Sequence, residues 1–443
     1  MLKAISPIDG RYQSKTQSLS PFFSEYALIK YRIYVELEYL EALIMDLELV
    51  SNDELVQFQV VKSEILKGFD EIEAVKVKEI EKVTNHDVKA VEYYIKEILA
   101  ERGFDKILEF THFGLTSQDI NNTAFPLMIK NALSEVIVPT LSSLLEHLID
   151  LSMKYQGIPM LARTHGQPAS PTTLGKEIFV FVERLENEMI LRSSITLKAK
   201  FGGATGNINA HKIAYPHRNW VDFANAFIEN LGLERYQTTT QIAHYDDLAA
   251  LCQSWMRINT ILIDFCRDIW TYISMEYFTQ KVIAGEVGSS AMPHKVNPID
   301  FENAEGNLGV ANALFSHLAE KLPISRLQRD LTDSTVLRNV GVPFAHTLIS
   351  LLSILKGLTK LELNEKKLQG DLDKNWAVTA EAIQNILRRE GIDKPYEKLK
   401  ELTRGNTEIT QQSLIKFIQT LDVNENVKQE LLEISPYNYV GYF

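Results

Sequence analysis

The chain has 443 residues, of which 45% are hydrophobic and 23% are charged, and its formal net charge at pH 7 is −12. This composition is typical of a fully folded globular chain of about three domains, and the acidic balance argues against nonspecific nucleic-acid binding, because a surface that follows phosphates is normally basic. The N-terminus lacks a signal pattern, and no apolar run approaches the roughly 20 residues of a membrane helix. We therefore expect a cytoplasmic protein that binds neither nucleic acid nor membrane, although local cations could still bind an anionic small substrate.

Residues 24–67 and 71–102 carry many charges and short apolar stripes, which predicts a small helical N-terminal domain over residues 1–106. The polar segment at residues 84–87 within this domain has two interpretations. Asn85 can cap a helix that holds Asp87 near the positive end of its dipole, or the segment can line a functional site.

Two further polar segments follow. Residues 116–119 precede a stretch with a helical pattern and are typical of a helix N-terminal cap. His165 stands between Thr164 and Gly166, just before Pro168, where a helix is not expected to continue. Taken alone, His165 can be a surface or capping histidine as well as a reactive one.

Residues 245–280 contain no Gly or Pro, and apolar residues recur there at helical spacing on two sides. A long helix with two apolar faces needs neighbours on both, so we expect a bundle that also packs against other subunits. Cys252 and Cys266 lie in this helix about 21 Å apart, at roughly 1.5 Å per residue, and are expected to be buried, unbridged thiols. Four more stretches of this kind complete the bundle: residues 124–154, 175–200, 301–321 and 343–367.

We predict an all-α fold of three helical domains, in which the long-helix bundle spans residues 107–363 and a small domain spans residues 364–443. Strand alternation is too short to build a sheet, although a hairpin near residues 199–209 is possible. The glycine-rich residues 202–206 lack the spacing of a dinucleotide fingerprint and are expected to form a turn. The ten histidines include no metal-binding pair, so we expect no catalytic metal.

Two polar segments do not look built for a core. The glycines and prolines of residues 285–298 favour a loop, and this loop carries two serine hydroxyls, an imidazole, an ammonium and an amide. An ordinary polar surface loop is the alternative interpretation. Residues 329–338 alternate charges and hydroxyls, which fits neither a clean helix face nor a loop tip. A solvated salt-bridge network is the alternative there.

Taken together, these segments resemble a known enzyme family. The order of motifs is similar to that of the bacterial type of adenylosuccinate lyases, the purine-pathway members of the fumarase/aspartase superfamily. His294, before Lys295, stands where fumarases and aspartases typically have Gly and argininosuccinate lyases have Gln. The segments that carry the resemblance are residues 9–12, 84–87, 116–117, 164–168, Gln241, 288–298 and 329–338.

The resemblance implies a fold and a reaction. It implies a homotetramer whose long helices form a central bundle and whose active sites are each built from three chains. It also implies β-elimination of fumarate from two nucleotide substrates, adenylosuccinate and SAICAR, giving AMP and AICAR, with no metal or organic cofactor. A sister lyase or cycloisomerase on the same scaffold, and a structural protein without activity, are the alternatives.

The resemblance also implies residue roles. Ser289 would be the general base that takes the Cβ proton, and His165 the general acid that protonates the leaving amine. A serine hydroxyl needs activation for this task, and Lys295, backbone amides and exclusion of water can provide it. Donors to the substrate carboxylate would be Lys295, Asn297, Thr116 and Ser117, and donors to the phosphate Arg11, Tyr12, Arg329, Ser334 and Arg338. The remaining expected contacts are Asn85, His86 (also a helper of His165), Asp87, Gln241, Ser290, Val296, Asn303, Thr335, Val336 and Leu337.

Overall fold

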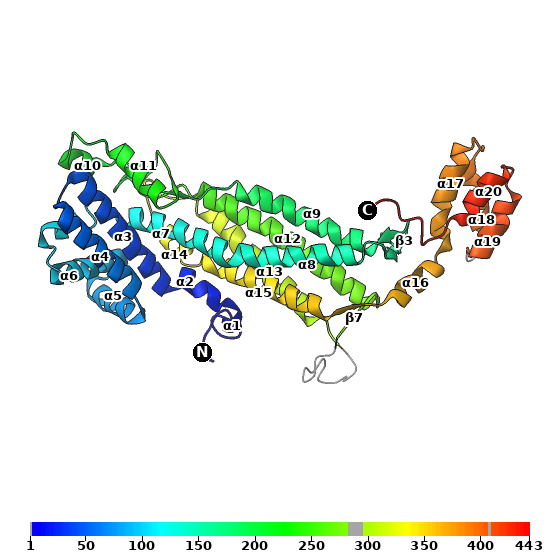
Figure 1. Ribbon diagram of the computed structural model, residues 1–443, viewed down its shortest axis with the longest axis horizontal. Coiled ribbons are helices and arrows are strands. Elements are labelled where there is room, and N and C mark those ends of the chain that lie inside the picture. The colour runs from blue at the N-terminus through cyan, green and yellow to red at the C-terminus, as the bar shows by residue number, and fades with distance from the viewer. Residues whose placement is uncertain (1, 282–295, 406–408) are drawn as a thin grey trace. The chain divides into compact units, whose positions relative to one another are not determined.

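The computed structural model describes residues 2–281, 296–405 and 409–443. These residues are mostly helical, which confirms the all-α fold class (Figure 1). They fold into two compact units. The first consists of Met1–Leu141, Glu188–Thr260 and Gly306–Leu352, and the second of Ser142–Asn187, Ile261–Glu305 and Ser353–Phe443. The division into three domains stays a prediction.

Polar caps start the N-terminal helices of the first unit. The side chains of Ser24, Ser51 and Asp70 accept backbone hydrogen bonds in the first turns of α3 (Glu25–Leu47), α4 (Asn52–Gly68) and α5 (Glu71–Thr84). Each cap satisfies N–H groups that the helix itself leaves unpaired, and this fixes where the helix begins. The other elements before residue 117 are α1 (Gln13–Thr16), η1 (Gln17–Leu19), α2 (Ser20–Phe23), α6 (Asp87–Glu101) and η2 (Asp105–Phe110).

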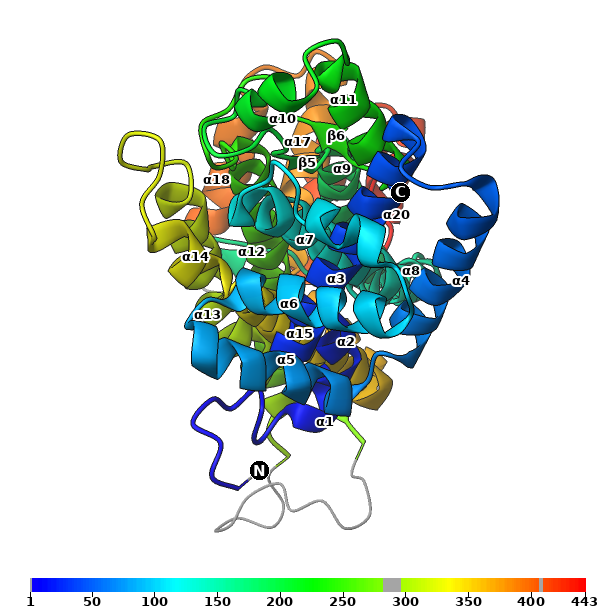
Figure 2. The same ribbon diagram turned by 90° about the vertical axis from the view of Figure 1, so that its left-hand side faces the viewer.

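Helix α3 has two buried faces that hold the first unit together. On one face Ile33, Leu37 and Leu40 pack with α4, α5 and α6, which surround α3 (Figure 2). On the other face Val35 and Tyr39 pack with α7 (Ser117–Ala132) and α11 (Trp220–Asn230). Each large apolar side chain buried in this way contributes about 1.5–3 kcal/mol, so α3 ties the N-terminal helices firmly to α7.

Five long helices contribute residues to both units: α8 (Val138–Lys154), α9 (Leu174–Ser193), α12 (Asp246–Ser274), α13 (Ile299–Lys321) and α15 (Gly341–Lys360). The five predicted helical stretches are thus confirmed, although their ends differ. Helix α12 ends at Ser274 rather than at residue 280, because Glu276 adopts a φ of 64° and the chain turns into β7 (Phe278–Gln280). Both cysteines of α12 are buried as expected, and burial raises the pKa of the Cys252 thiol to about 12.

The short strands lie elsewhere than predicted. The hairpin considered possible near residues 199–209 does not form, because β5 (Lys198–Ala199) pairs in parallel with the distant β6 (Glu234–Arg235). The turn expected at residues 202–206 is confirmed by a hydrogen bond from Gly206 N to Gly203 O. The other elements that lie wholly in the first unit are η3 (Leu133–Ile137, a π-helical turn), α10 (Asn209–Ala214) and α14 (Thr332–Leu337).

The second unit joins bundle helices to a small helical cluster. In the cluster, the apolar sides of four short helices enclose a separate core that includes Ile383, Leu387 and Leu414. These four helices are α17 (Ala380–Arg389), α18 (Pro395–Gly405), α19 (Gln411–Thr420) and α20 (Glu425–Glu433). The other elements of this unit are β1 (Pro159–Met160), β2 (Arg163–Thr164), β3 (Gln167–Pro168), β4 (Thr172–Thr173), β8 (Leu361–Leu363, paired antiparallel with β7), α16 (Glu365–Asp373) and η4 (Trp376–Thr379).

Two helical stretches are long and apolar enough to cross a membrane by length and composition alone, Ser117–Lys154 and Thr332–Lys360. This differs from the expectation that no stretch approaches that length, because uncharged polar residues are interspersed with the apolar ones. The apolar window of Thr332–Lys360 is 78% buried inside the protein. Core helices of soluble proteins have the same character, so neither stretch indicates a membrane protein by itself.

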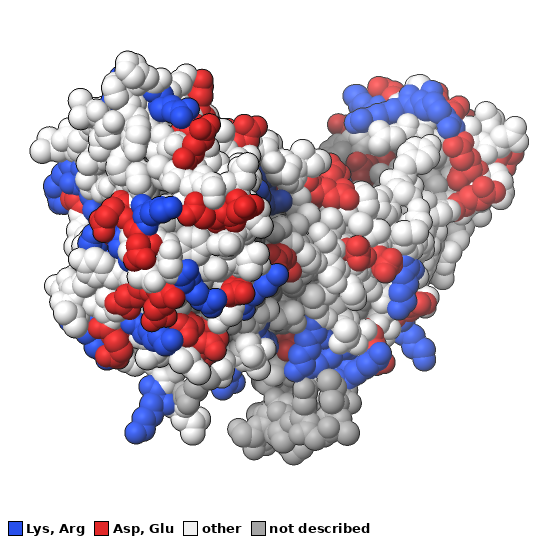
Figure 3. Space-filling view, turned by 60° about the vertical axis from the view of Figure 1, so that its left-hand side comes forward, with Lys and Arg blue, Asp and Glu red and all other residues white. Residues whose placement is uncertain are grey.

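Charged side chains of both signs are interspersed on the protein surface. Figure 3 shows Lys and Arg beside Asp and Glu across the face that it presents. Many of these charges form local pairs such as Lys76 with Glu73 and Lys82 with Glu79. The face shown therefore gives no continuous basic stripe among its described residues, in keeping with the net charge of −12.

His211 on α10 is fully buried in the core between α3 and α11. Tyr39 donates its hydroxyl proton to Phe113 O at 2.6 Å, so His211 Nε2, which lies 2.7 Å from the Tyr39 oxygen, must be the donor to it. The other ring nitrogen, Nδ1, is buried and has no hydrogen-bond partner among the described residues. Burial lowers the pKa of His211 to about 4, because a second proton on the ring would place an unpaired charge in the core.

We expect His211 to weaken the fold in acid. Between the ordinary pKa of 6.5 and about 4, the unfolded chain binds a proton that the folded chain excludes, so stability falls as pH falls through this window. The full loss is about 3 kcal/mol. Urea midpoints measured from pH 7 to pH 4 should fall less steeply for His211→Gln than for the wild type. His217→Gln, at an exposed histidine nearby, should behave like the wild type. Parallel pH profiles for His211→Gln and wild type would contradict this.

Candidate active site

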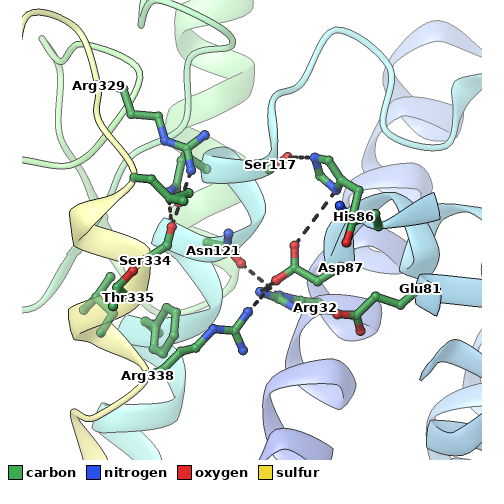
Figure 4. A pocket seen from close by; sticks show the side chains of 15 residues that line it. Arg32, Glu81, His86, Asp87, Ser117, Asn121, Arg329, Ser334, Thr335 and Arg338 are labelled. Carbon is green, nitrogen blue, oxygen red and sulfur yellow. Dashed lines mark hydrogen bonds and ion pairs between the residues drawn. The ribbon is translucent and has the colours of Figure 1, made fainter. Parts of the chain in front are cut away.

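The largest group of predicted site residues lines one cavity of about 460 Å³ in the first unit (Figure 4). Three segments that are distant in sequence form its walls: the turn between α5 and α6, the start of α7, and the segment from Arg329 through α14. The predicted residues that line it are Asn85, His86, Asp87, Ser117, Arg329, Ser334, Thr335, Leu337 and Arg338.

The first wall is a turn in which one helix ends and the next begins. Asn85 has a φ of 51° and is the C-cap of α5, so the interpretation of Asn85 as the N-cap of α6 is wrong. His86 takes that role instead, because its Nδ1 accepts a hydrogen bond of 3.1 Å from Lys89 N. The proton of the neutral ring is therefore on Nε2, which lies 3.4 Å from Ser117 Oγ. In this state His86 presents a donor to the second wall.

Asp87 lies between two guanidinium groups, as Figure 4 shows. Its Oδ2 accepts hydrogen bonds of 2.7 Å from Arg32 Nη2 and of 2.7 Å from Arg338 Nη2. Burial alone would raise the pKa of Asp87, but the charges and hydrogen bonds of these arginines outweigh it and hold that pKa below its ordinary value. Asp87 is thus an anion at neutral pH and holds both arginines at the cavity.

The second wall is fixed by a fully buried ion pair. Thr116 is the N-cap of α7, as its segment suggested, and Asp119 accepts a hydrogen bond of 2.8 Å from Thr116 N. Asp119 also binds Lys200 Nζ at 2.7 Å, and both side chains have 0% exposure. The same carboxylate accepts backbone hydrogen bonds from Gly202 N and Gly203 N. Asp119 therefore joins the start of α7 to the glycine-rich turn at residues 202–206.

The third wall is held by buried polar contacts. Gln118 Nε2 donates at 3.1 Å to both Asp333 Oδ2 and Ser334 Oγ, and the Tyr245 hydroxyl donates to Asp333 Oδ2 at 2.9 Å. Arg329 donates to Gln241 Oε1 at 3.1 Å and to Ser334 Oγ at 3.4 Å. Residues 329–338 thus combine a short helix with a polar network, and both of its arginines reach the cavity.

Other predicted residues lie at the edge of this site or away from it. Gln241 contacts Arg329, which lines the cavity, Thr116 directly precedes the lining residue Ser117, and Val336 belongs to α14, but none of the three lines the cavity. Arg11 is exposed and Tyr12 half-buried in the N-terminal segment, and neither lines the cavity. Val296, Asn297 and Asn303 belong to the second unit, where Ser353 donates to Asn303 Oδ1 at 3.1 Å. Ser289, Ser290 and Lys295 lie outside the described residues.

His165 lies in the second unit at the tip of a tight hairpin. Strands β2 and β3 pair Thr164 with Gln167, which leaves His165 and Gly166 as the two turn residues. Both have positive φ, 54° and 76°, as the type I′ turn that matches strand twist requires. The His165 side chain is exposed, and no hydrogen bond or ion pair joins it to another part of the chain that the structure describes.

Sequence reasoning missed six residues that line the cavity. Arg32 had a readable signal, because it interrupts the apolar stripe of Leu28, Val35 and Tyr39 on α3, and a charge on a buried helix face needs a partner. Two others, Gln118 and Leu331, lie within the polar segments 116–119 and 329–338, from which other residues were predicted. The last three have no comparable signal, because they belong to ordinary helices that the fold brings together: Glu81, Asn121 and Phe125.

The arrangement suits an anionic ligand. Arg32 approaches the cavity from α3, and Arg329 and Arg338 approach it from the segment 329–338; the Ser334 hydroxyl and the His86 imidazole also line it. Guanidinium groups match the geometry of phosphate and carboxylate oxygens. Within the described residues no group of three or more His, Cys, Asp or Glu side chains is placed to hold a metal ion.

Comparisons with known proteins agree along the whole chain. A family model described as lyase matches residues 10–312, and one described as adenylosuccinate lyase C-terminal matches residues 325–440. The adenylosuccinate lyase of Dictyostelium discoideum is 58% identical over 456 residues, which cover 99% of this chain and 97% of the relative. The adenylosuccinate lyase of Escherichia coli strain K12 is 48% identical over 446 residues, with the same coverage of 99% and 97%.

Solved structures show the same fold at much lower identity. The 3-carboxy-cis,cis-muconate lactonizing enzyme of Pseudomonas putida has a TM-score of 0.76 and 20% identity, over 96% of this chain and 94% of that one. The fumarate lyase of Mesorhizobium sp. BNC1 has a TM-score of 0.74 and 18% identity, over 96% and 95%. At this identity the likeness concerns the fold alone.

We expect the Asp119–Lys200 pair to be essential for the stability of the first unit. Asp119→Asn leaves the Lys200 ammonium buried without a counter-ion, which should lower the free energy of unfolding by about 3–5 kcal/mol. The double variant Asp119→Asn with Lys200→Met removes both charges and should be more stable than Asp119→Asn alone. Glu79→Gln breaks an exposed pair and should cost less than about 1 kcal/mol. Denaturant unfolding of the four proteins measures this, and equal losses for Asp119→Asn and Glu79→Gln would refute it.

Proposed function

The chain belongs to the adenylosuccinate lyase family of the fumarase/aspartase superfamily, and on that premise we propose that it releases fumarate from adenylosuccinate, giving AMP, and from SAICAR, giving AICAR. It is a lyase that acts on a carbon–nitrogen bond. The observation that carries the function is 58% identity to an adenylosuccinate lyase across 99% of the chain. Its place is purine nucleotide biosynthesis, with nucleotides as substrates.

The reaction requires two proton transfers. A base takes the proton from the carbon next to a carboxylate, the electron pair forms the carbon–carbon double bond of fumarate, and the amine leaves as an acid protonates its nitrogen. Ser289 is the proposed base and His165 the proposed acid. Exposure of His165 at a hairpin tip supports its role, since no described partner holds the imidazole away from a substrate. Lys295 and exclusion of water would activate Ser289.

The cavity of the first unit is the proposed phosphate site. Arg329 and Arg338 supply charged donors, and Ser334 and Thr335 supply hydroxyls from the same short helix. His86, with its proton on Nε2, can donate a further hydrogen bond to phosphate or assist His165. Thr116 and Ser117, at the start of α7, with Lys295 and Asn297, would bind the substrate carboxylate whose charge grows in the intermediate. Arg11, Tyr12, Gln241, Ser290 and Asn303 are proposed as further substrate contacts.

Assembly from several chains would bring these groups together. We infer a homotetramer in which three chains contribute to each site, with the base and the acid on different chains. Large apolar side chains exposed on the long helices support this, among them Met153 on α8, Ile190 on α9 and Trp270 on α12. The same proposal places the enzyme in the cytoplasm, free of membrane and nucleic acid, with no metal or organic cofactor.

We expect the purified protein to release one fumarate for each adenylosuccinate and each SAICAR consumed, without added metal and in the presence of a chelator. Fumarate can be measured with a coupled enzyme assay, and AMP and AICAR by chromatography. Argininosuccinate and 3-carboxymuconate serve as controls for sister reactions on the same fold. Turnover of neither nucleotide substrate would count decisively against the function.

We expect Ser289→Ala to lower kcat by at least about a thousandfold while substrate binding, measured by calorimetry, changes little. The physical reason is that the hydroxyl acts on the proton in the transition state and contributes little to ground-state affinity. Ser290→Ala, at the neighbouring hydroxyl, should retain far more activity. His165→Gln should also reduce kcat strongly. Near-normal kcat in Ser289→Ala would assign the base to another residue.

A further inference from the structure

The Arg338 guanidinium is shared between two carboxylates from different helices. Its Nη2 donates to Asp87 Oδ2 at 2.7 Å, and its Nη1 donates to Glu25 Oε2 at 3.0 Å. Asp87 begins α6 and Glu25 begins α3, so the ends of two helices meet at this one side chain. Arg338 remains 42% exposed, and its other N–H groups are available to a ligand.

The two carboxylates have different structural roles. Asp87 is also the counter-ion of Arg32, which is 2% exposed, so loss of Asp87 would leave a buried charge unpaired. Glu25 is 45% exposed, and its ion pairs are with Arg338 and, at 3.1 Å, with Lys78 Nζ. The Ser24 side chain, not Glu25, caps α3. Glu25 can therefore be changed without disturbing the fold.

Charge at this end of the cavity is nearly balanced by the protein itself. Lys78 binds Glu81 at 2.6 Å as well as Glu25, and Glu81 lines the cavity. Three cations thus stand against three carboxylates: Arg32, Arg338 and Lys78 against Asp87, Glu25 and Glu81. Arg329 is a further cation that is not part of this balance, because its hydrogen bonds go to the neutral side chains of Gln241 and Ser334.

Apart from Arg329, the cations that a phosphate dianion meets in this cavity are already partly neutralised. We propose that Glu25 is an affinity-determining residue, which withholds part of the charge of Arg338 and thereby limits how tightly the cavity binds the nucleotide phosphate. Weaker binding of AMP favours its release after each turnover. This inference rests on the proposed function, since it takes the cavity to be the phosphate site.

The effect of Glu25 is measured on product binding rather than on turnover. We expect Glu25→Gln to bind AMP about two- to fivefold more tightly than the wild type in calorimetric titrations at low salt, the range that a partly exposed ion pair supports. The difference should shrink at high salt, because mobile ions screen the same charge. In steady-state assays the KM for adenylosuccinate should fall by a similar factor.

A matched control separates this local effect from net charge. Glu71 is also the first residue of a helix in the same unit, is exposed, and has no ion pair with a described residue. Glu71→Gln therefore removes the same charge at an equivalent position without touching Arg338. It should bind AMP as the wild type does. If Glu71→Gln tightens AMP binding as much as Glu25→Gln, the effect is one of net charge and the inference is overturned.

A substitution of Lys78 should change the affinity for AMP in the opposite direction. Lys78→Met removes the second cation from Glu25, which then holds Arg338 more strongly, so AMP should bind about twofold more weakly. In the Glu25→Gln background the same substitution should have a smaller effect, because only the pair of Lys78 with Glu81 remains to be broken. An equal effect in both backgrounds would overturn the route through Glu25.

The remaining outcomes are also decisive. AMP binding that is equal in wild type and Glu25→Gln would overturn the inference and leave the proposed function intact. Failure of both proteins to bind AMP would overturn the assignment of the cavity as the phosphate site, and the inference with it. Circular dichroism and the urea midpoint confirm that each variant is folded.

Discussion

The buried ion pair of Asp119 and Lys200 is the constraint on which the candidate site depends. Neither charge has contact with solvent, so neither can exchange its partner for water, and the start of α7 cannot move independently of the segment that carries Lys200. From that first turn of α7, Ser117 reaches His86 and Gln118 reaches α14. All three walls of the cavity are therefore positioned from one short turn of helix.

Asp87, at the start of α6, holds two arginines at the cavity, and this shows how a chain of negative net charge can form a candidate site for an anion. The net charge of −12 describes the whole surface, where both signs are mixed, while affinity for an anion depends on a few cations in a concave place. Asp87 brings Arg32 and Arg338 to that place from elements far apart in sequence. It also neutralises part of their charge. The same carboxylate therefore sets both the position of the two guanidinium groups and the positive charge that they leave for a ligand.

Sequence patterns predicted the helices and most of the cavity but not the finer geometry. Apolar periodicity located the five long helices, since burial on two faces leaves a strong pattern, yet it missed the end of α12 at Ser274, where no Gly or Pro marks the turn. His86, not Asn85, caps the start of α6, because either polar residue can cap a helix and only the packing of α5 against α6 decides between them. Arg32 was missed because its partners come from α6 and α7, which no local pattern connects.

The backbone conformation of the hairpin limits which amino acids are tolerated at position 165. A left-handed φ of 54° is costly for most side chains, and among residues other than glycine it is tolerated best by asparagine, aspartate and histidine. Of those three, imidazole alone gains and loses a proton near neutral pH. The shape of the turn and the proposed role of His165 as general acid thus favour the same residue independently, which leaves few substitutions acceptable at this position.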